Sequence, residues 1–397
     1  MDTAKIIRKS YKFRIYPTKA QVKTLEMTLE LCRELYNAAR KERIDAWRLE
    51  RKSISYFDQS AQLPEIKNIR EELKEVYAHV LREPLRNVDK AFQAFFARIK
   101  RKEKAGFPRF KTTLRFNSFC YPQANKTSVR VENNKLNLPK IGKLKIKLSR
   151  PILGEVKTCT IKRENDKWFA VFSVETATEP LPKTGKEIGI DVGIENFATL
   201  SDGTQIENSK FFQSTQKKLK VAQRRVSRRN KFSNGRKKAQ KQVSKIHLKI
   251  RNQRWDFQHK LSTKLVGEFD LIAIENLNIK GMSKGILSKQ IHDVAWSNFF
   301  NMLRYKAESA DRKLIEVNPR GTSQTCICGE TVKKDLSVRL HQCEKCGLSQ
   351  HRDIVSAKII LRLGQAAEMS PSEKISHKEI TYAVRQSVSL ESSNKTF

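Results

Sequence analysis

The first hydrophobic pattern along the chain has a period of two residues and then changes to a helical one. Tyr11, Phe13 and Ile15 alternate with basic residues, which is typical of a half-buried β-strand. Directly after the proline that ends this pattern, Thr18 and Gln21 have the spacing of a helix capping box. The pattern therefore predicts a strand followed at once by a long helix.

Three segments between residues 18 and 105 carry apolar residues every three or four positions, with lysine and arginine between them. Because each segment has only one apolar stripe, we expect them to pack on one another as a small helical domain. The apolar positions are Val22, Leu25, Leu29, Cys32, Tyr36 and Ala39 in the first segment, Ile66, Ile69, Leu73 and Val76 after Pro64, and Leu85, Val88, Phe92, Phe95 and Phe96 after Pro84.

Strand patterns return after residue 106. Leu144, Ile146 and Leu148 alternate with lysines, which predicts a strand with one basic face, and residues 157–175 predict a hairpin that turns at Asn165 and Asp166. The simplest organisation is a β domain of residues 1–17 plus 106–182 that is interrupted by the helical domain of residues 18–105.

A second series of short apolar strands follows a linker expected at residues 180–186. Asp202-Gly203 has the residue types of a hairpin turn between two of these strands. The expected strands are residues 187–192, 197–200, 204–207, 271–275 and 314–317.

Three acidic residues stand out in this second half of the chain. Asp191 and Glu275 end apolar strands, where an unpaired carboxylate is costly to bury, and Asp353 begins an apolar segment. Asp353 taken alone has an alternative explanation, because an acid at a helix start interacts favourably with the helix dipole. Together the three offer the oxygen ligands that two Mg²⁺ ions, about 4 Å apart, require for phosphodiester hydrolysis.

The net charge points to a nucleic-acid partner. The chain has 80 Lys and Arg against 42 Asp and Glu, a formal charge of +38. Residues 210–260 hold 18 Lys and Arg with one acid, Asp256, so we expect helices that contact phosphates, with Trp255 and Phe257 packed rather than stacked on bases. The candidate phosphate contacts here are Lys217, Lys218, Arg224, Arg225, Arg228, Arg229, Arg236, Lys237 and Lys238, and those of the basic strand are Lys143, Lys145 and Lys147.

Four of the seven cysteines lie within a short segment. Cys343 and Cys346 have the spacing of a zinc knuckle, whereas Cys326 and Cys328 are separated by one residue instead of the usual two. We expect the four to bind one structural Zn²⁺, with His341 as an alternative ligand. The competing interpretation is a reduced loop without metal.

Several motifs resemble those of the insertion-sequence OrfB/TnpB family, and the resemblance covers roughly residues 8–363. The three acids lie within the motifs that make this resemblance most specific. The matching segments are Gly189-Ile190-Asp191-Val192-Gly193, Phe197-Ala198-Thr199-Leu200-Ser201-Asp202-Gly203, Ile274-Glu275-Asn276-Leu277-Asn278-Ile279-Lys280-Gly281-Met282, Arg352-Asp353, Tyr11-Lys12-Phe13-Arg14-Ile15-Tyr16-Pro17-Thr18, Leu35-Tyr36-Asn37-Ala38-Ala39 and Asp89-Lys90-Ala91-Phe92-Gln93-Ala94-Phe95-Phe96.

The resemblance implies an α/β multidomain protein. It has a wedge β-barrel carrying an inserted helical recognition domain, followed by an RNase H-like (RuvC) nuclease domain, residues 183–320 plus 351–364, with a zinc ribbon at 321–350. The family's catalytic acids correspond to Asp191, Glu275 and Asp353. The implied function is a transposon-encoded endonuclease that cuts double-stranded DNA, directed by a guide RNA from the transposon end, and type V CRISPR effectors are more distantly similar. Residues 365–397 have few large apolar side chains, so we expect a loosely ordered tail.

Two departures from the family pattern lie next to the third acid. The family usually has Asp at the position of His351 and Asn at that of Val355. Groups that surround metal ligands orient them and tune metal binding, so these two departures could impair the nuclease. An alternative function is therefore an RNA-guided DNA-binding protein or repressor with an impaired nuclease. A third hypothesis, a transposase that performs strand transfer itself, ranks lower because the likeness extends over nearly the whole chain.

The sequence predicts a cytoplasmic protein of a prokaryote, associated with the nucleoid and without a membrane partner. No segment approaches the roughly 20 apolar residues of a membrane span. The guide sequence, the target-adjacent motif and the oligomeric state are not predicted.

Overall fold

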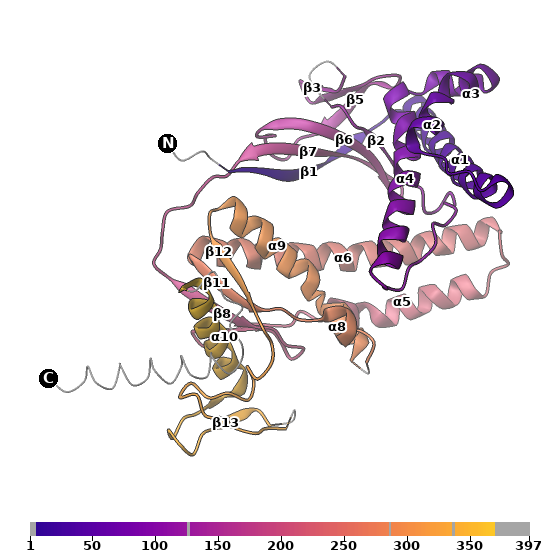
Figure 1. Cartoon of the computed structure of the whole chain (residues 1–397). Helices are drawn as coiled ribbons and strands as arrows, with labels where there is room; N and C mark the ends of the chain where they lie inside the picture. The colour runs from indigo at the N-terminus through magenta and orange to yellow at the C-terminus, as the bar shows by residue number, and fades with distance from the viewer. Residues whose placement is uncertain (1–4, 125–127, 286, 336–337, 370–397) are drawn as a thin grey trace. The chain divides into compact units, whose positions relative to one another are not determined.

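The chain folds into two compact units, Met1–Ala177 and Thr178–Phe397, and each is described by itself. Figure 1 shows the computed structural model of the chain. The structure describes residues 5–124, 128–285, 287–335 and 338–369. Within these ranges, no helix has the length and apolar character needed to cross a membrane.

Unit 1 contains a seven-stranded sheet in the order β2-β6-β7-β1-β5-β4-β3 (Figure 1). The first strand of the chain lies inside this sheet, antiparallel to both β7 and β5. Its side chains Tyr11, Phe13 and Ile15 are buried, so the predicted strand is confirmed. The strands are β1 Ile6–Tyr16, β2 Ser118–Tyr121, β3 Arg130–Glu132, β4 Lys135–Leu138, β5 Gly142–Lys147, β6 Glu155–Glu164 and β7 Lys167–Ala177.

Two further strand predictions in unit 1 are confirmed. β6 and β7 form an antiparallel hairpin, and Asn165 adopts φ +53° in its turn. On β5, Leu144 and Ile146 are buried, while the intervening lysines are exposed. The sheet therefore presents an apolar face to the core, and at β5, between β1 and β4, a basic face to solvent.

The helices of unit 1 begin with the predicted capping box. Gln21 N donates to Thr18 Oγ1 at 3.3 Å, and Thr18 N donates to Gln21 Oε1 at 3.0 Å. Two expectations are wrong in detail. The helix expected after Pro84 begins at Ala78, because burial of apolar side chains in its first turns outweighs the missing proline N–H, and Ile69 is 84% exposed at the end of a short helix. The elements are α1 Lys19–Glu50, α2 Tyr56–Ala61, α3 Leu63–Ile69, the 3₁₀-helix η1 Glu71–Glu75 and α4 Ala78–Lys100.

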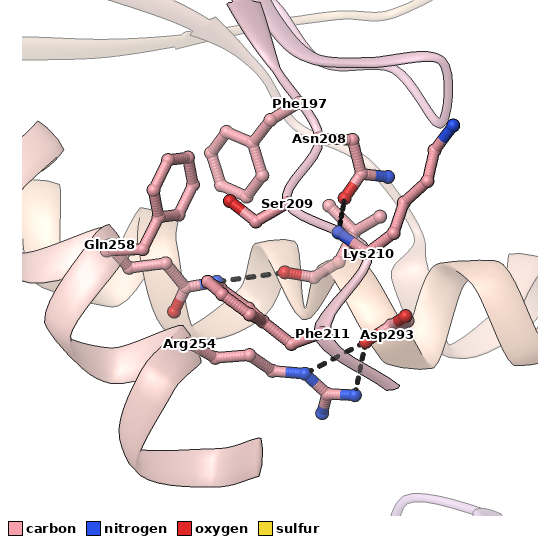
Figure 2. A pocket seen from close by; sticks show the side chains of 10 residues that line it. Phe197, Asn208, Ser209, Lys210, Phe211, Arg254, Gln258 and Asp293 are labelled. Atoms are coloured by element: carbon pink, nitrogen blue, oxygen red, sulfur yellow. Dashed lines mark hydrogen bonds and ion pairs between the residues drawn. The ribbon is translucent and has the colours of Figure 1, made fainter. Parts of the chain in front are cut away.

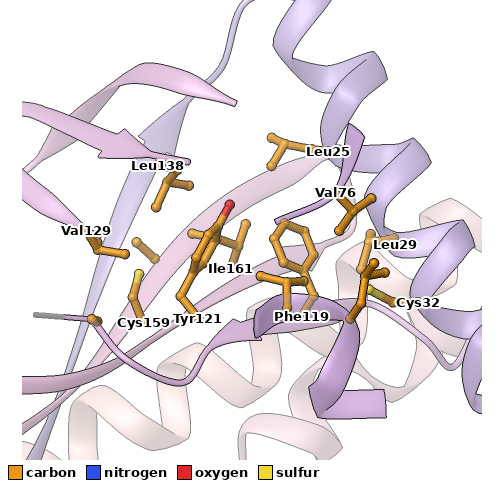
Figure 3. Close-up of a cluster of buried hydrophobic side chains, with 14 of the residues drawn as sticks. Leu25, Leu29, Cys32, Val76, Phe119, Tyr121, Val129, Leu138, Cys159 and Ile161 are labelled. Atoms are coloured by element: carbon orange, nitrogen blue, oxygen red, sulfur yellow. The ribbon is translucent and has the colours of Figure 1, made fainter. Parts of the chain in front are cut away.

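One core joins the helices of unit 1 to its sheet. Figure 3 shows Leu25, Leu29 and Cys32 from α1 directed toward Phe119 and Tyr121 from β2. The burial of this apolar surface is the main force that holds the inserted helices on the sheet.

Unit 2 is built on a five-stranded sheet in the order β10-β9-β8-β11-β12. β8, β11 and β12 run parallel, whereas β9 and β10 are antiparallel additions. The turn between β9 and β10 places Gly203 at φ +96°, as the Asp202-Gly203 pair predicts. The strands are β8 Glu187–Asp191, β9 Asn196–Leu200, β10 Gln205–Glu207, β11 Leu271–Glu275 and β12 Lys313–Val317.

Helices cover both faces of this sheet, which explains why the interiors of the parallel strands β8 and β11 are short continuous apolar runs. Ala273 faces α10, whereas Ile272 and Ile274 pack with α6 and α9. Two long helices, α5 and α6, form the basic hairpin that extends from this core (Figure 1). The helices are α5 Phe211–Ser227, α6 Asn234–Glu268, α7 Ile279–Met282, α8 Ser288–Val294, α9 Trp296–Ser309 and α10 Arg352–Met369.

The segment expected to be a linker is bonded to unit 2. Glu179 N and Leu181 N donate to the carbonyls of Ser309 and Ala310, at 3.0 and 3.1 Å. The backbone N–H of Thr184 donates to the carboxylate of Asp270. This segment therefore approaches β8 along a fixed path.

The end of the described chain is more ordered than expected. α10 continues to Met369, because its last turn is alanine-rich and Glu368 pairs with Lys313 of β12. The prediction of a loose tail is therefore wrong for residues 365–369, and the rest of that tail lies outside the described residues. Before α10, the short strands β13 Leu340–Gln342 and β14 Ser349–His351 form a hairpin that carries part of the cysteine segment.

Candidate functional site

The strand register brings Asp191 and Glu275 to the same face of the sheet in unit 2. β8 and β11 are parallel neighbours in which Ala273 is paired with Gly189 and Ile274 with Ile190. Because side chains alternate along a strand, Gly189, Asp191, Ala273 and Glu275 all lie on the α10 face. The two carboxylates therefore emerge side by side at the carboxyl ends of the strands.

Two glycines allow α10 to approach this face closely. A Cβ on Gly189 would lie 2.7 Å from the backbone N of Leu361 and closer still to the carbonyl of Ala357. A Cβ on Gly364 would lie 2.6 Å from Cβ of Ala273. Neither position has room for a side chain, so these contacts fix the height of α10 above the strands.

Asp353 belongs to the first turn of α10 and completes the set. It lines a single cavity of about 440 Å³ together with Asp191 and Glu275, here called the acid cavity. The three predicted acids therefore line one cavity, and their role as catalytic residues stays a prediction. The other lining residues are Val192, Gly193, Ile194, Glu195, Asn196, Thr199, Leu277, Leu287, Trp296, Pro319, Thr322, Ser323, Arg339, Arg352 and Ser356.

The electrostatics of the acid cavity favour a cation. Burial raises the pKa of Asp191 well above its ordinary value, and the negative charges of Glu275 and Asp353 raise it further. The carboxylate opens into the cavity but is surrounded by protein on its other sides. The Arg352 charge lowers the pKa of Asp191 and offsets part of this effect. Three mutually repelling carboxylates in a protein interior are the donor set that a hard divalent cation neutralises.

A hydrogen bond holds the side chain of Glu275 in one orientation within the cavity. The Thr322 hydroxyl donates to Glu275 Oε1 at 2.5 Å from the loop that follows β12. Burial raises the pKa of Glu275, and this hydrogen bond lowers it in part. Sequence analysis missed Thr322. Its signal is a loop with a glycine at the carboxyl end of the strand beside Glu275, where α/β sheets usually place their ligand sites.

The two departures next to Asp353 have different surroundings. Val355 is 1% exposed and is a core residue rather than part of the cavity lining. His351 lies beside the acid, because its Nδ1 accepts from the backbone N of Asp353 at 3.3 Å and is 4.0 Å from Oδ2. Only the histidine is therefore placed to alter the charge at the third acid.

The four clustered cysteines also converge. Their sulfur atoms all lie within 4.8 Å of one another, and the shortened Cys326–Cys328 pair takes part like the other. Sγ of Cys326 is 3.6 Å from that of Cys346, and Sγ of Cys328 is 3.7 Å from that of Cys343. Tetrahedral Zn–S bonds of about 2.3 Å place sulfurs about 3.8 Å apart, so the set fits zinc.

His341 is not part of this cluster. Its ring is fully buried, its Nδ1 contacts Nζ of Lys334, and among the residues that the structure describes the group of possible metal ligands contains the four cysteines and not this histidine. The alternative in which His341 replaces a cysteine is therefore not supported, because the four thiols converge without it. Backbone N–H donation from Cys346 lowers the pKa of Cys343 to about 7, which favours the thiolate that a zinc ion binds.

The candidate phosphate contacts lie on the basic hairpin of α5 and α6 and on the loop between these helices. Eight of the nine are exposed. Arg236 is half-buried, and its guanidinium donates to the carbonyls of Val226 and Arg229, so it holds the loop. Phe257 packs edge-on against Phe197 as expected, but Trp255 is 37% exposed.

The root of the basic hairpin is fixed by a buried ion pair (Figure 2). Asp293 of α8 accepts from the Arg254 guanidinium of α6 and from the backbone N of Phe212 at the start of α5. Gln258 donates to the carbonyl of Val294 nearby. A buried carboxylate with these partners joins three helices at one point, so the hairpin leaves the sheet in a defined direction.

Three family profiles match the chain. Residues 169–285 match the OrfB_IS605 family, described as "Probable transposase", residues 296–360 match "Cas12f1-like, TNB domain", and residues 1–52 match "Helix-turn-helix domain". The last of these segments contains one strand, β1, and the single 32-residue helix α1.

Relatives of known name match over nearly the full chain. A protein of Streptomyces pristinaespiralis named "Putative RNA-guided DNA endonuclease" is 35% identical over 98% of this chain and 98% of its own length. The Escherichia coli (strain K12) protein "Putative RNA-guided DNA endonuclease InsQ" is 32% identical over 90% of this chain and 92% of its own length.

One solved structure, "Cryo-EM structure of CasPhi-2 (Cas12j) bound to crRNA", aligns with 94% of this chain and 99% of its own at 10% identity. Its TM-score of 0.46 is too low to compare the arrangement of elements. Identity and coverage against the two named relatives are decisive instead, and the chain belongs to the insertion-sequence OrfB/TnpB family.

Proposed function

We propose that the protein is the RNA-guided DNA endonuclease of a transposable element and that it hydrolyses phosphodiester bonds of target DNA. The observation that carries this proposal is the acid cavity, in which Asp191, Glu275 and Asp353 come together from two parallel strands and one helix. The names of two relatives support the reaction. A guide RNA from the transposon end and double-stranded DNA are the proposed partners.

Asp191, Glu275 and Asp353 would hold two Mg²⁺ ions. When bound, such ions supply an activated water and stabilise the leaving oxygen of a phosphodiester. The residues of the chain prepare the site for them. Thr322 orients Glu275 by its hydrogen bond, and the close packing of α10 on Gly189 sets the position of Asp353.

The cationic side chains at the acid cavity have a complementary role. Arg339 and Arg352 line the cavity together with the acids, and Arg339 pairs with Glu195 at 2.8 Å. These charges attract the phosphate backbone toward a site that would otherwise repel it. They would hold the scissile strand against the carboxyl edge of the sheet while leaving its sequence unread.

Sequence recognition would be delegated to base pairing with the guide RNA. The exposed cations of α5, α6 and their loop, with Lys143, Lys145 and Lys147 of β5, would contact the backbones of the RNA and its heteroduplex with DNA. The protein itself would read only a short motif beside the target.

The cysteine cluster would bind one structural Zn²⁺. It lies in the segment between β12 and α10, so the metal would hold the chain that leads from the Glu275 side of the cavity to Asp353. All four ligands come from the protein, which is typical of a closed structural site rather than a catalytic one.

The test is a cleavage assay with the natural complex. The protein is purified with RNA transcribed from the 3′ end of its gene, and a plasmid library with a matching target is incubated with it and Mg²⁺. We expect double-strand cleavage that requires the guide and that Asp191→Ala abolishes. Guide-dependent binding with no cleavage by the wild type would contradict the nuclease.

A guided DNA-binding protein without nuclease activity is the second candidate function. The observation that favours it is His351, 4.0 Å from Asp353 Oδ2 at a position where the family usually has an acid. The discriminating variant is His351→Asp. If wild type binds but does not cut and His351→Asp cuts, the repressor is the function of the natural chain.

A further inference from the structure

A second cavity adjoins the acid cavity on the other face of the sheet. It has a volume of about 270 Å³ and shares Glu275 and Leu277 with the acid cavity. Its remaining walls come from α9, the loop after β11 and Glu316 of β12, so we call it the amide cavity after its three asparagines. The lining residues are Glu275, Asn276, Leu277, Asn278, Ile279, Ser297, Phe300, Asn301, Arg304 and Glu316.

The charges of the amide cavity favour a neutral ligand. The single cation of the lining is Arg304. Its Nε and Nη2 atoms both lie 2.6 Å from Oε1 of Glu316, so the two side chains form an ion pair. Glu275 adds a further carboxyl group. With two acids and one arginine that is already paired with one of them, this lining carries a net negative charge and does not attract a phosphate.

The polar groups are those that read the edge of a nucleobase. Asn276, Asn278, Ser297 and Asn301 are exposed and offer amide or hydroxyl groups for hydrogen bonds. Asn278 offers chiefly its NH₂ group, because its Oδ1 accepts from Gly281 N at 3.0 Å. Asn301 Oδ1 accepts from Arg304 at 2.7 Å, which fixes the side chain and leaves its NH₂ group to donate to a ligand. Leu277 supplies a half-buried apolar surface for the base.

We infer that the amide cavity binds the base of a nucleotide next to the scissile phosphate in an unpaired stretch of DNA. The inference rests on the proposed nuclease function, because it takes the phosphate position from the acid cavity. The DNA strand would cross the carboxyl edge of the sheet at Glu275 and Leu277. Its phosphate would lie on the acid side of this edge and its neighbouring base on the α9 side.

The decisive variants lie on one helix. Asn301→Leu fills the amide cavity with an apolar side chain and removes its fixed amide. Asn298→Leu is the matched control, because Asn298 is an exposed residue of the same helix that does not line the cavity. Both replace an asparagine by the same good helix former, so folding differences should be small.

The first experiment measures binding without cleavage. The guide-loaded protein is mixed with target DNA that carries 2-aminopurine at successive positions around the cut site, with Ca²⁺ in place of Mg²⁺. We expect a fluorescence change at one position next to the scissile phosphate, lost in Asn301→Leu and kept in Asn298→Leu. No change at any position, or an unaltered change in Asn301→Leu, would overturn the inference.

The second experiment measures cleavage of DNA with one abasic nucleotide at the same positions. Wild type should lose about tenfold in rate at the position found by fluorescence, whereas Asn301→Leu should be slow on intact DNA and lose nothing more. Equal sensitivity of both proteins would contradict the base contact. Absence of all cleavage with a retained fluorescence change would count against the nuclease and not against the amide cavity.

Discussion

The acid cavity and the cysteine cluster both gather metal-binding groups, but different parts of the fold hold them. The acids rest on two buried strands and on a helix that contacts those strands through Gly189 and Gly364. The cysteines lie in turns, and the strands beside Cys343 and Cys346 are only three residues long. We therefore expect the acid cavity to keep its geometry without metal, and the cysteine cluster to depend on zinc for its own.

The largest effect should come from Asp191→Asn, which removes one charge of the acid cavity and leaves the size of the side chain unchanged. Cleavage should fall by about 10³-fold, the upper end of what one preorganised charge-stabilising group contributes. The fold should persist, because removing one of three carboxylate charges reduces their mutual repulsion in the protein without metal. Cleavage rates and thermal melting of the same preparation check both parts, and a variant that unfolds would break the comparison.

Cys343→Ser should have the next largest effect, on structure rather than on chemistry. The chain should lose its zinc, from about one ion to none, because three thiolates no longer close the site. Protease cleavage within residues 321–350 should then become rapid, while unit 1 stays resistant. Elemental analysis and limited proteolysis measure this, with Cys120→Ala as a control outside the cluster. Zinc retained at the wild-type level would contradict the assignment.

Gly189→Ala tests whether close packing positions the third acid. The added methyl group would overlap the backbone of α10 and push Asp353 away from Asp191. A displacement of this kind can lower the rate about 100-fold although no catalytic group is changed. Gly267→Ala is the control, because it lies in α6 with no atom near its added Cβ. Equal rates in both variants would show that α10 adapts freely.

Thr322→Val should have a smaller effect, because it removes one hydrogen bond to Glu275 and preserves shape. The pKa of Glu275 should rise further, since the bond that lowers it is gone. The variant should need more Mg²⁺ and a higher pH for its best rate, with a loss of about tenfold under wild-type conditions. A pH profile that does not shift, with only a lower maximum, would assign Thr322 to packing instead.

The smallest effect should be a pH-dependent stabilisation by Mg²⁺ in the protein without nucleic acid. Because the folded pKa values of Asp191 and Glu275 are raised, the unfolded chain ionises first as pH increases. As the pH rises above the ordinary carboxyl pKa range, the contribution of these two groups to the free energy of unfolding therefore falls. It stops falling once the pH is above their raised folded pKa values. Mg²⁺ should raise the melting temperature more at mildly alkaline than at mildly acidic pH, by about 2–4 °C for each kcal/mol of binding. Asp191→Asn should weaken this difference, and a pH-independent shift would contradict it.

Local patterns gave the elements that carry the site. Alternation identified β1, β5 and the β6–β7 hairpin, and short apolar runs identified β8 and β11 with their terminal acids. These predictions succeeded because strand periodicity and turn residues act over a few positions. Local patterns located one helix start wrongly, since Pro84 predicts a start that the burial of Val80 and Leu81 overrides.

Cysteine spacing gave the metal cluster but not its final membership. One residue fewer between Cys326 and Cys328 left His341 as a possible fourth ligand, and only the folded turn shows that all four sulfurs meet. His341 instead became a core residue beside Lys334. Spacing limits which atoms can reach a metal, whereas the backbone path decides which ones do.

The sequence by itself determined the residue types of this protein: three acids at the ends of apolar segments, four thiols and a large excess of cations. Tertiary structure alone decided that Thr322 bonds Glu275, that Gly189 lies beneath α10 and that an amide cavity adjoins the acids. The physical reason is range. Periodicity and charge are properties of neighbouring residues, but a cavity is formed by side chains that meet only when strand register and helix packing are both fixed.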